Sequence, residues 1–212
     1  QWTQPLSKPD WIKDYRLPEE NSLVEEINKV DEKLNEATRE KEIVQKKTNE
    51  MELLKGLLYE SGKYGLEPPV RNAFRIIGFN VSEPEEYDKP YDLFAREGET
   101  LIIGEIEGSK SQVDVDKYRQ LLDYVDEATL KGNKCKGILI GSGYVDIEPS
   151  KRKEQFTEHA IRGCDSHKYC RITTIELYNA VKAVLSEPQN QELKKLIKEK
   201  ILKCESEFKC KD

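Results

Sequence analysis

The stretch PYDLFAREGETLIIGEIEG, Pro90 to Gly108, decides the expected fold of this chain. It contains two apolar segments, about Tyr91–Arg96 and Thr100–Glu107, which the short loop EGE joins. Glycine in a loop of this length favours the positive φ that a β-hairpin turn requires. We therefore predict two antiparallel strands. The second strand carries Glu105 and Glu107 inside an apolar run, and these two acids need a chemical explanation.

Three acidic side chains are expected to converge on this hairpin. Alternate residues of a strand point to the same face, so Glu105 and Glu107 should be neighbours in space. The hairpin also brings Asp92 beside Glu105. Burying adjacent carboxylates is costly unless a cation neutralises them, and Mg²⁺ or Mn²⁺ prefers oxygen ligands of this kind. The alternative is a solvent-facing strand, in which the glutamates pair with Lys or Arg and Asp92 belongs to a turn.

The elements around the hairpin predict an α/β domain. From Leu66 the order reads αβββαβαβα, which is typical of a mixed sheet with helices on both faces. The first expected elements are a helix over about Leu66–Ile77 that ends at Gly78, the short strand FNVSEP and the hairpin. A helix over Val115–Leu130 and the central strand KGILIG follow. The last elements are a helix near Gln155–His167, the strand YCRIT, the helix IELYNAVKAVL and a lysine-rich helix over about Asn190–Lys203. The tail after Lys203 is expected to fray.

A different pattern precedes this domain. Apolar residues recur at intervals of four and three, which predicts a helix from about Glu19 to Tyr59. This pattern favours a self-associating coiled coil, and so a homodimer of undetermined helix orientation; the alternative is a long helix folded back on its own domain. We divide the chain into a linker or docking arm (1–18), a coiled-coil helix (19–61), the α/β domain (62–188) and a C-terminal helix and tail (189–212). The seam positions are Leu23, Ile27, Val30, Leu34, Ala37, Lys41, Val44, Thr48, Met51, Lys55 and Leu58.

Composition limits the classes of function. The chain has 212 residues, 36% of them hydrophobic and 36% charged, with a net charge of −6. No global basic field therefore indicates nucleic-acid binding, although a local basic patch is compatible with this charge. No apolar run approaches the roughly 20 residues that span a bilayer. Five cysteines are too few for a disulfide framework in a chain this long. We expect a soluble cytoplasmic protein with no membrane partner.

The hairpin also resembles a known signature. PYD, followed after twelve residues by EIE, resembles the motif of the PD-(D/E)xK, or restriction endonuclease-like, nuclease superfamily. GLEPPVRNAFRIIGFNV is similar to the superfamily's first helix and strand, and KYRQLLDYV is similar to the helix after the catalytic strand. The resemblance implies a restriction-endonuclease-like fold, a metal site of Glu67, Asp92 and Glu105 for Mg²⁺ or Mn²⁺, and Gln120 facing the site. It also implies nucleic acid as the partner and hydrolysis of phosphodiester bonds as the activity.

One position departs from the pattern. The superfamily usually has a lysine where this chain has Glu107, and that lysine orients or activates the attacking water. Glu107 would then serve as a general base or as a ligand of a second metal ion, or Lys110 would supply the missing amine. The alternative is a domain that has lost catalysis and acts as a dimeric scaffold that binds nucleic acid or protein.

Overall fold

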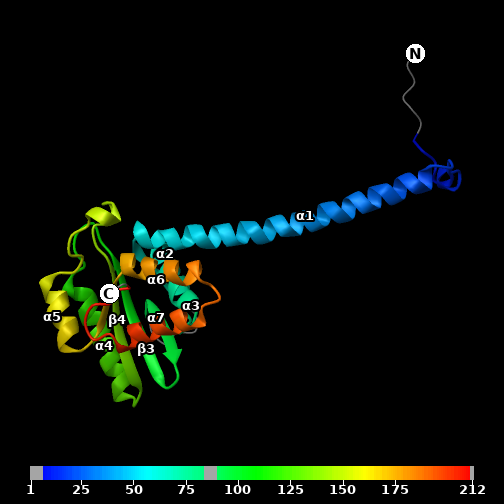
Figure 1. Ribbon diagram of the computed structural model, residues 1–212. Coiled ribbons are helices and arrows are strands. Elements are labelled where there is room, and N and C mark those ends of the chain that lie inside the picture. The colour runs from blue at the N-terminus through cyan, green and yellow to red at the C-terminus, as the bar shows by residue number, and fades with distance from the viewer. Residues whose placement is uncertain (1–6, 84–89, 211–212) are drawn as a thin grey trace. The chain divides into compact units, whose positions relative to one another are not determined.

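The computed structural model describes residues 7–83 and 90–210. The chain divides into two compact units, one up to Asn49 and one from Glu50 onwards. The first six residues of the predicted arm lie outside the described residues; the rest of it contains the short 3₁₀ helix η1 (Asp10–Asp14), whose side chains are all exposed. The predicted long helix is present as α1 (Glu20–Lys55), which Figure 1 shows as one continuous helix.

Short elements follow α1 and lead into the α/β unit. The 3₁₀ helix η2 (Gly56–Leu58) and the single turn α2 (Gly62–Gly65) precede α3 (Glu67–Ile77). Two prolines occupy the first turn of α3, where their missing N–H groups cost no helical hydrogen bond. Gly78 ends α3 in the left-handed conformation at φ +105°, as its place in the sequence predicts.

The sheet has five strands in the order β1-β2-β3-β4-β5. They are β1 (Asn80–Val81), β2 (Leu93–Glu97), β3 (Thr100–Gly108), β4 (Lys134–Ser142) and β5 (Cys170–Thr173). The pairs β1-β2 and β2-β3 are antiparallel, whereas β3-β4 and β4-β5 are parallel, so the sheet is mixed as predicted. The predicted hairpin turn is confirmed, because Glu97 pairs with Thr100 across Gly98 at φ +57°.

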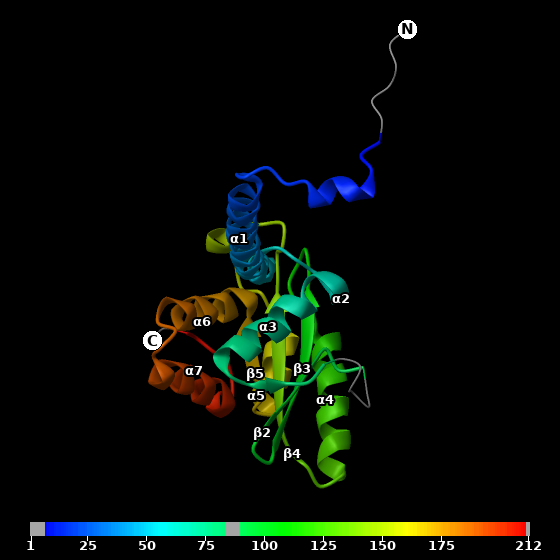
Figure 2. The same cartoon turned by 90° about the vertical axis from the view of Figure 1, so that its right-hand side faces the viewer.

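Helices cover both faces of the sheet, as Figure 2 shows. On one face lie α3, α6 (Thr174–Ser186) and α7 (Gln191–Lys203), whose apolar side chains share a core with Ile102, Ile138 and Ile140 of the sheet. On the other face lie α4 (Val115–Leu130) and α5 (Glu158–Ser166), which pack with Ile103 and Leu139. A 3₁₀ helix, η4 (Pro149–Lys151), lies between β4 and α5. The predicted element order is confirmed.

The tail beyond α7 differs from the expectation. The prediction that it frays is wrong over the described residues, because the backbone N–H of Arg171 in β5 donates to the carbonyl of Ser206 at 2.7 Å. The N–H of Phe208 donates to the carbonyl of Arg171 at 2.8 Å, and the Phe208 side chain is only 1% exposed. The open edge of β5 offers unpaired backbone groups, and the aromatic ring fills the core beside it. Within the described residues, no helix combines the length and the apolar character that a bilayer crossing needs.

Candidate functional site

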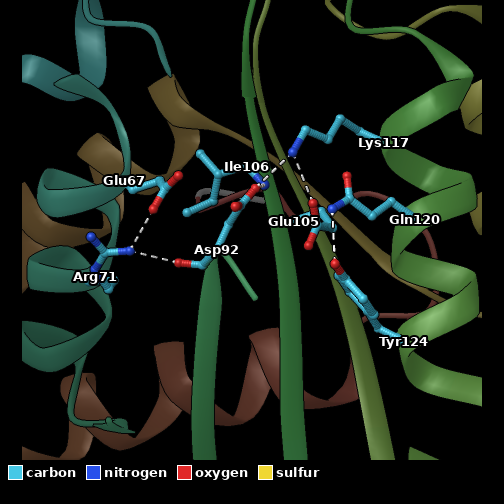
Figure 3. A network of polar contacts seen from close by, with 8 residues as sticks. All are labelled: Glu67, Arg71, Asp92, Glu105, Ile106, Lys117, Gln120 and Tyr124. Atoms are coloured by element: carbon cyan, nitrogen blue, oxygen red, sulfur yellow. Dashed lines mark hydrogen bonds and ion pairs between the residues drawn. The ribbon is translucent and has the colours of Figure 1, made fainter. Parts of the chain in front are cut away.

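The hairpin brings Asp92 and Glu105 together at one end of the β2-β3 pair. Leu93 pairs with Gly104, so Asp92 stands opposite Glu105. The backbone N–H of Ile106 donates to Oδ2 of Asp92 at 2.9 Å, and this bond orients the aspartate toward β3. Figure 3 shows the two carboxylates between α3 on one side and α4 on the other. The predicted convergence of these two acids on the hairpin is present in the structure.

A lysine joins the two carboxylates. The Nζ of Lys117, in the first turn of α4, lies 3.0 Å from Oδ2 of Asp92 and 3.0 Å from Oε2 of Glu105 (Figure 3). Its side chain is only 25% exposed. Asp114 caps the helix, accepting from the N–H of Val115 at 2.7 Å, and so fixes where the first turn of α4 begins. The ammonium therefore sits between two acids with little access to solvent.

Glu105 is the most constrained member of this group. It is 0% exposed, and its Oε1 has no hydrogen-bond partner among the described residues. Burial raises the pKa of Glu105 to about 8; the charge of Asp92 adds to this shift, and Lys117 opposes it. Burial alone would lower the pKa of Lys117, but Glu105 and Asp92 outweigh burial and hold it above its usual range. Burial thus favours the protonated form of Glu105, whereas the two acids favour the charged form of Lys117.

Glu107 lies two residues further along β3 and lines an open hollow. Burial raises the pKa of Glu107, Lys117 opposes that shift, and Asp92 reinforces it. The hollow has a volume of about 500 Å³, and Glu107, Lys117 and Gln120 form part of its wall. The rest of the wall is polar too, since Ser109, Ser111 and Gln112 contribute to it. Lys117 thus connects the wall of the hollow with the two carboxylates.

Glu67 has a partner of its own. Its Oε2 accepts from Nη1 of Arg71 at 2.8 Å, and both side chains are about 10% exposed. Burial raises the pKa of Glu67, whereas the hydrogen bond from Arg71 opposes the shift. The same Nη1 donates to the backbone carbonyl of Asp92 at 2.9 Å (Figure 3). Glu67 is therefore linked to the backbone of Asp92 through Arg71, which donates to both.

Gln120 and Lys110 occupy different surroundings. Gln120 lies one turn after Lys117 on the same side of α4, and its Nε2 donates to the hydroxyl of Tyr124 at 3.1 Å (Figure 3). Lys110 lies outside the network: it is 82% exposed, and its Nζ pairs with Asp146 at 3.2 Å. The amine at the carboxylates thus belongs to Lys117, which the sequence analysis did not select. The available signal was its position three residues before Gln120, because residues at this spacing share a helix face.

The acidic side chains of the site were compared with the ligands that a divalent cation needs. The expected three-residue metal site of Glu67, Asp92 and Glu105 is not formed, because among the described residues no group of three or more His, Cys, Asp or Glu side chains lies close enough to hold a metal ion and Glu67 pairs with Arg71. Two acidic side chains with hard oxygen atoms do meet, and one buried oxygen of Glu105 has no partner there. Mg²⁺ is usually held by one or two carboxylates and completes its octahedron with water or substrate oxygens. The two carboxylates therefore match the donor chemistry of a divalent cation, which would compete with the ammonium of Lys117 for them.

Comparisons with known proteins add little. No protein-family model matches the sequence, and no curated protein matches it. One solved structure, described as an EndoMS–dsDNA2 complex, is similar over 44% of this chain and 35% of its own, at 19% identity and a TM-score of 0.32. The match thus spans about a third of that protein's length, and a likeness at this TM-score carries no argument about function.

Proposed function

We propose that the protein is a Mg²⁺- or Mn²⁺-dependent nuclease that hydrolyses phosphodiester bonds. The observation that supports this most is the buried group of Asp92, Glu105 and Lys117, in which one ammonium contacts both acids and one carboxyl oxygen stays unpartnered. An unpaired buried acceptor is costly, and a bound cation would give this oxygen a partner. The proposal rests on this group and on the motif that Asp92 and Glu105 match.

The roles follow from position. Asp92 and Glu105 would hold the cation, which when bound supplies charge for the developing phosphorane oxygens and lowers the pKa of a coordinated water. Lys117 takes the part that the superfamily gives to the lysine replaced here by Glu107. Its amine reaches the acids from α4 instead of from β3. There it offsets the charge of the acids and orients the attacking water. Glu107 accepts a proton from that water, because it lines the hollow next to the amine.

The remaining predicted residues act at the periphery. Gln120 binds substrate from the wall of the hollow. Glu67 is a positioning residue in this proposal, since its carboxylate holds Arg71 and Arg71 fixes the backbone of Asp92. Lys110 contributes to neither role, because its amine pairs with Asp146 at the surface.

The test separates cation binding from chemistry. Calorimetry with Mn²⁺ and cleavage of plasmid and single-stranded substrates are measured on the wild type, Glu105→Gln and Lys117→Met. Glu105→Gln loses both Mn²⁺ binding and cleavage, because an amide is a poor ligand for the cation. Lys117→Met keeps or tightens Mn²⁺ binding, because the competing ammonium is gone, while its cleavage rate falls about 100-fold or more.

Lys110→Met is the matched control, because it removes the same charge from an exposed lysine whose amine pairs with Asp146 at the surface, and it leaves both readouts unchanged. A wild type that neither binds Mn²⁺ nor cleaves would contradict the proposal. That outcome would favour the second candidate, a non-cleaving scaffold that binds nucleic acid or protein, for which the bridging Lys117 already neutralises the acids.

Self-association is a separate part of the proposal. The seam of α1 would join two copies into a homodimer through a coiled coil, because its apolar positions keep heptad spacing along most of the helix. Sedimentation equilibrium of the full chain tests this part, and its result does not depend on metal binding.

A further inference from the structure

The apolar seam of α1 is open to solvent along most of the helix. Ile27, Val30, Leu34 and Val44 are 59%, 62%, 61% and 62% exposed. Single exposed apolar residues are ordinary, but a repeated line of them on one helix marks a surface that another helix covers. The charged residues beside the seam then decide the orientation of that second helix.

The spacing assigns each residue of α1 to a heptad position. Within residues 23–52, the core positions named a are Ile27, Leu34, Lys41 and Thr48. The core positions named d are Leu23, Val30, Ala37, Val44 and Met51. The flanking positions named g are Glu26, Lys33, Glu40 and Lys47, and those named e are Val24, Asp31, Thr38, Gln45 and Glu52.

The g positions carry the orientation signal. Their charges alternate strictly between acid and base, and none of the four takes part in an ion pair within residues 7–83 and 90–210. The e positions carry little charge by comparison. An arrangement in which g residues face g residues would therefore use this alternation, whereas one in which g faces e would leave most of it unmatched.

A parallel pair of helices matches these charges poorly. In that arrangement each g residue faces the e residue five positions later, so Glu26 meets Asp31, which is a like-charge contact. Lys41 faces its own copy in the core. The single favourable contact joins Lys47 to Glu52, and Glu52 already pairs with Lys55 in its own helix.

An antiparallel pair matches all four charges in one register. In that arrangement g faces g, so Glu26 meets Lys47 and Lys33 meets Glu40, each twice by symmetry. The core layers of this register join Ile27 to Val44 and Leu34 to Ala37. Lys41 then lies beside Val30 of the other copy, where its alkyl stem covers apolar surface and its ammonium reaches water.

Neighbouring registers are excluded by the same residues. A slip of one heptad in one direction sets Lys33 against Lys47 and Glu40 against its own copy. A slip in the other direction sets Glu26 against Glu40 and Lys33 against its own copy. Every flanking contact among these residues then joins like charges, so the pattern selects one register by disfavouring its alternatives.

We propose that two copies of this chain associate through α1 as an antiparallel coiled coil in which Glu26 faces Lys47 and Lys33 faces Glu40. The inference rests on the self-association part of the proposed function and not on its metal chemistry. The paired region covers residues 20–51, about 48 Å of helix. The two α/β units then follow from opposite ends of the coiled coil.

Charge reversal at the g positions tests orientation directly. The variant Glu26→Lys with Glu40→Lys places lysine at all four g positions. Sedimentation equilibrium should show its self-association at least about tenfold weaker than that of the wild type, because all four contacts become repulsive. Mixing it with the variant Lys33→Glu and Lys47→Glu should restore a heterodimer, since every contact is again between opposite charges.

The control is Glu25→Lys with Glu32→Lys, which makes the same charge change on the far side of the helix and should leave association unchanged. Circular dichroism verifies that all variants keep their helix content. Stronger association of the Glu26→Lys and Glu40→Lys variant would overturn the proposal in favour of a parallel pair, because Asp31 would then face a cation instead of an acid. A wild type that stays monomeric at high concentration would overturn it as well. Glu105→Gln should dimerise normally, so failure of the nuclease proposal is recognised separately.

Discussion

At the scale of single residues, the site depends on how one lysine is shared. Lys117 contacts Asp92 and Glu105 at the same distance, 3.0 Å, so its single charge stands against two acids. Burial makes two negative charges there expensive, and the proton on Glu105 removes one of them. Without a bound cation, burial therefore favours protonation of Glu105.

The stability of the protein should depend on pH when a chelator removes divalent cations. The pKa of Glu105 is about 8 in the folded protein, above its ordinary value, so its contribution is fully present below about pH 4.5 and is lost as the pH rises through 8. The unfolding free energy should fall across this window by an amount on the order of 4 kcal/mol as an upper bound. The pKa of Lys117 is raised too, but it lies above this window and leaves it unaffected.

Urea unfolding of the wild type and of Glu105→Gln across this range measures the effect. The amide imitates the protonated acid, so the fall between pH 4.5 and 8 should be much smaller in the variant. Equal slopes in both proteins would show that Glu105 titrates as an exposed glutamate does.

At the scale of elements, the tail and β5 stabilise each other. The tail residues Ser206 and Phe208 exchange backbone hydrogen bonds with Arg171, which gives β5 a partner on its otherwise open edge. Glu176 accepts from the N–H of Cys210 at 2.8 Å and ties the end of the tail to α6. The segment after α7 is thus an integral part of the α/β unit.

Replacing Phe208 tests this view. Phe208→Ala should lower the unfolding free energy by about 3 kcal/mol, because a ring that is 1% exposed leaves a cavity in the core. Hydrogen exchange at the amide of Arg171 should accelerate as well, since its acceptor is the carbonyl of Ser206. Lys209→Ala is the control, because that side chain is 50% exposed; a loss as large as that of Phe208→Ala would point to a general effect of tail substitutions.

At the scale of the whole molecule, the two units carry separate tasks. The α/β unit holds the buried acids and the hollow, whereas α1 holds the seam and its alternating charges. The net charge of −6 gives no long-range attraction for nucleic acid, so the proposed substrate binding would depend on local contacts. The proposed association and the proposed catalysis can therefore be tested independently.

The salt dependence of association reports on the charge contacts between g residues. Raising the salt from about 0.05 M to about 0.5 M should weaken the wild-type dimer, because screening reduces the attraction between g residues. The same change should strengthen association of the Glu26→Lys and Glu40→Lys variant, whose contacts are repulsive. Sedimentation at both salt concentrations measures the two slopes, and slopes of equal sign would contradict the assignment of charges to the interface.

Local sequence patterns were enough to predict the order of the elements, the long helix, the hairpin and the meeting of Asp92 with Glu105. These follow from periodicity, glycine punctuation and strand alternation, all of which are local properties of the chain. Which amine contacts the acids could not be predicted from local patterns, because Lys110 is nearer in sequence whereas Lys117 comes from α4. The tertiary structure also decided that Arg71 holds Glu67 and that the tail packs on β5, since contacts between distant segments depend on how the helices pack on the sheet.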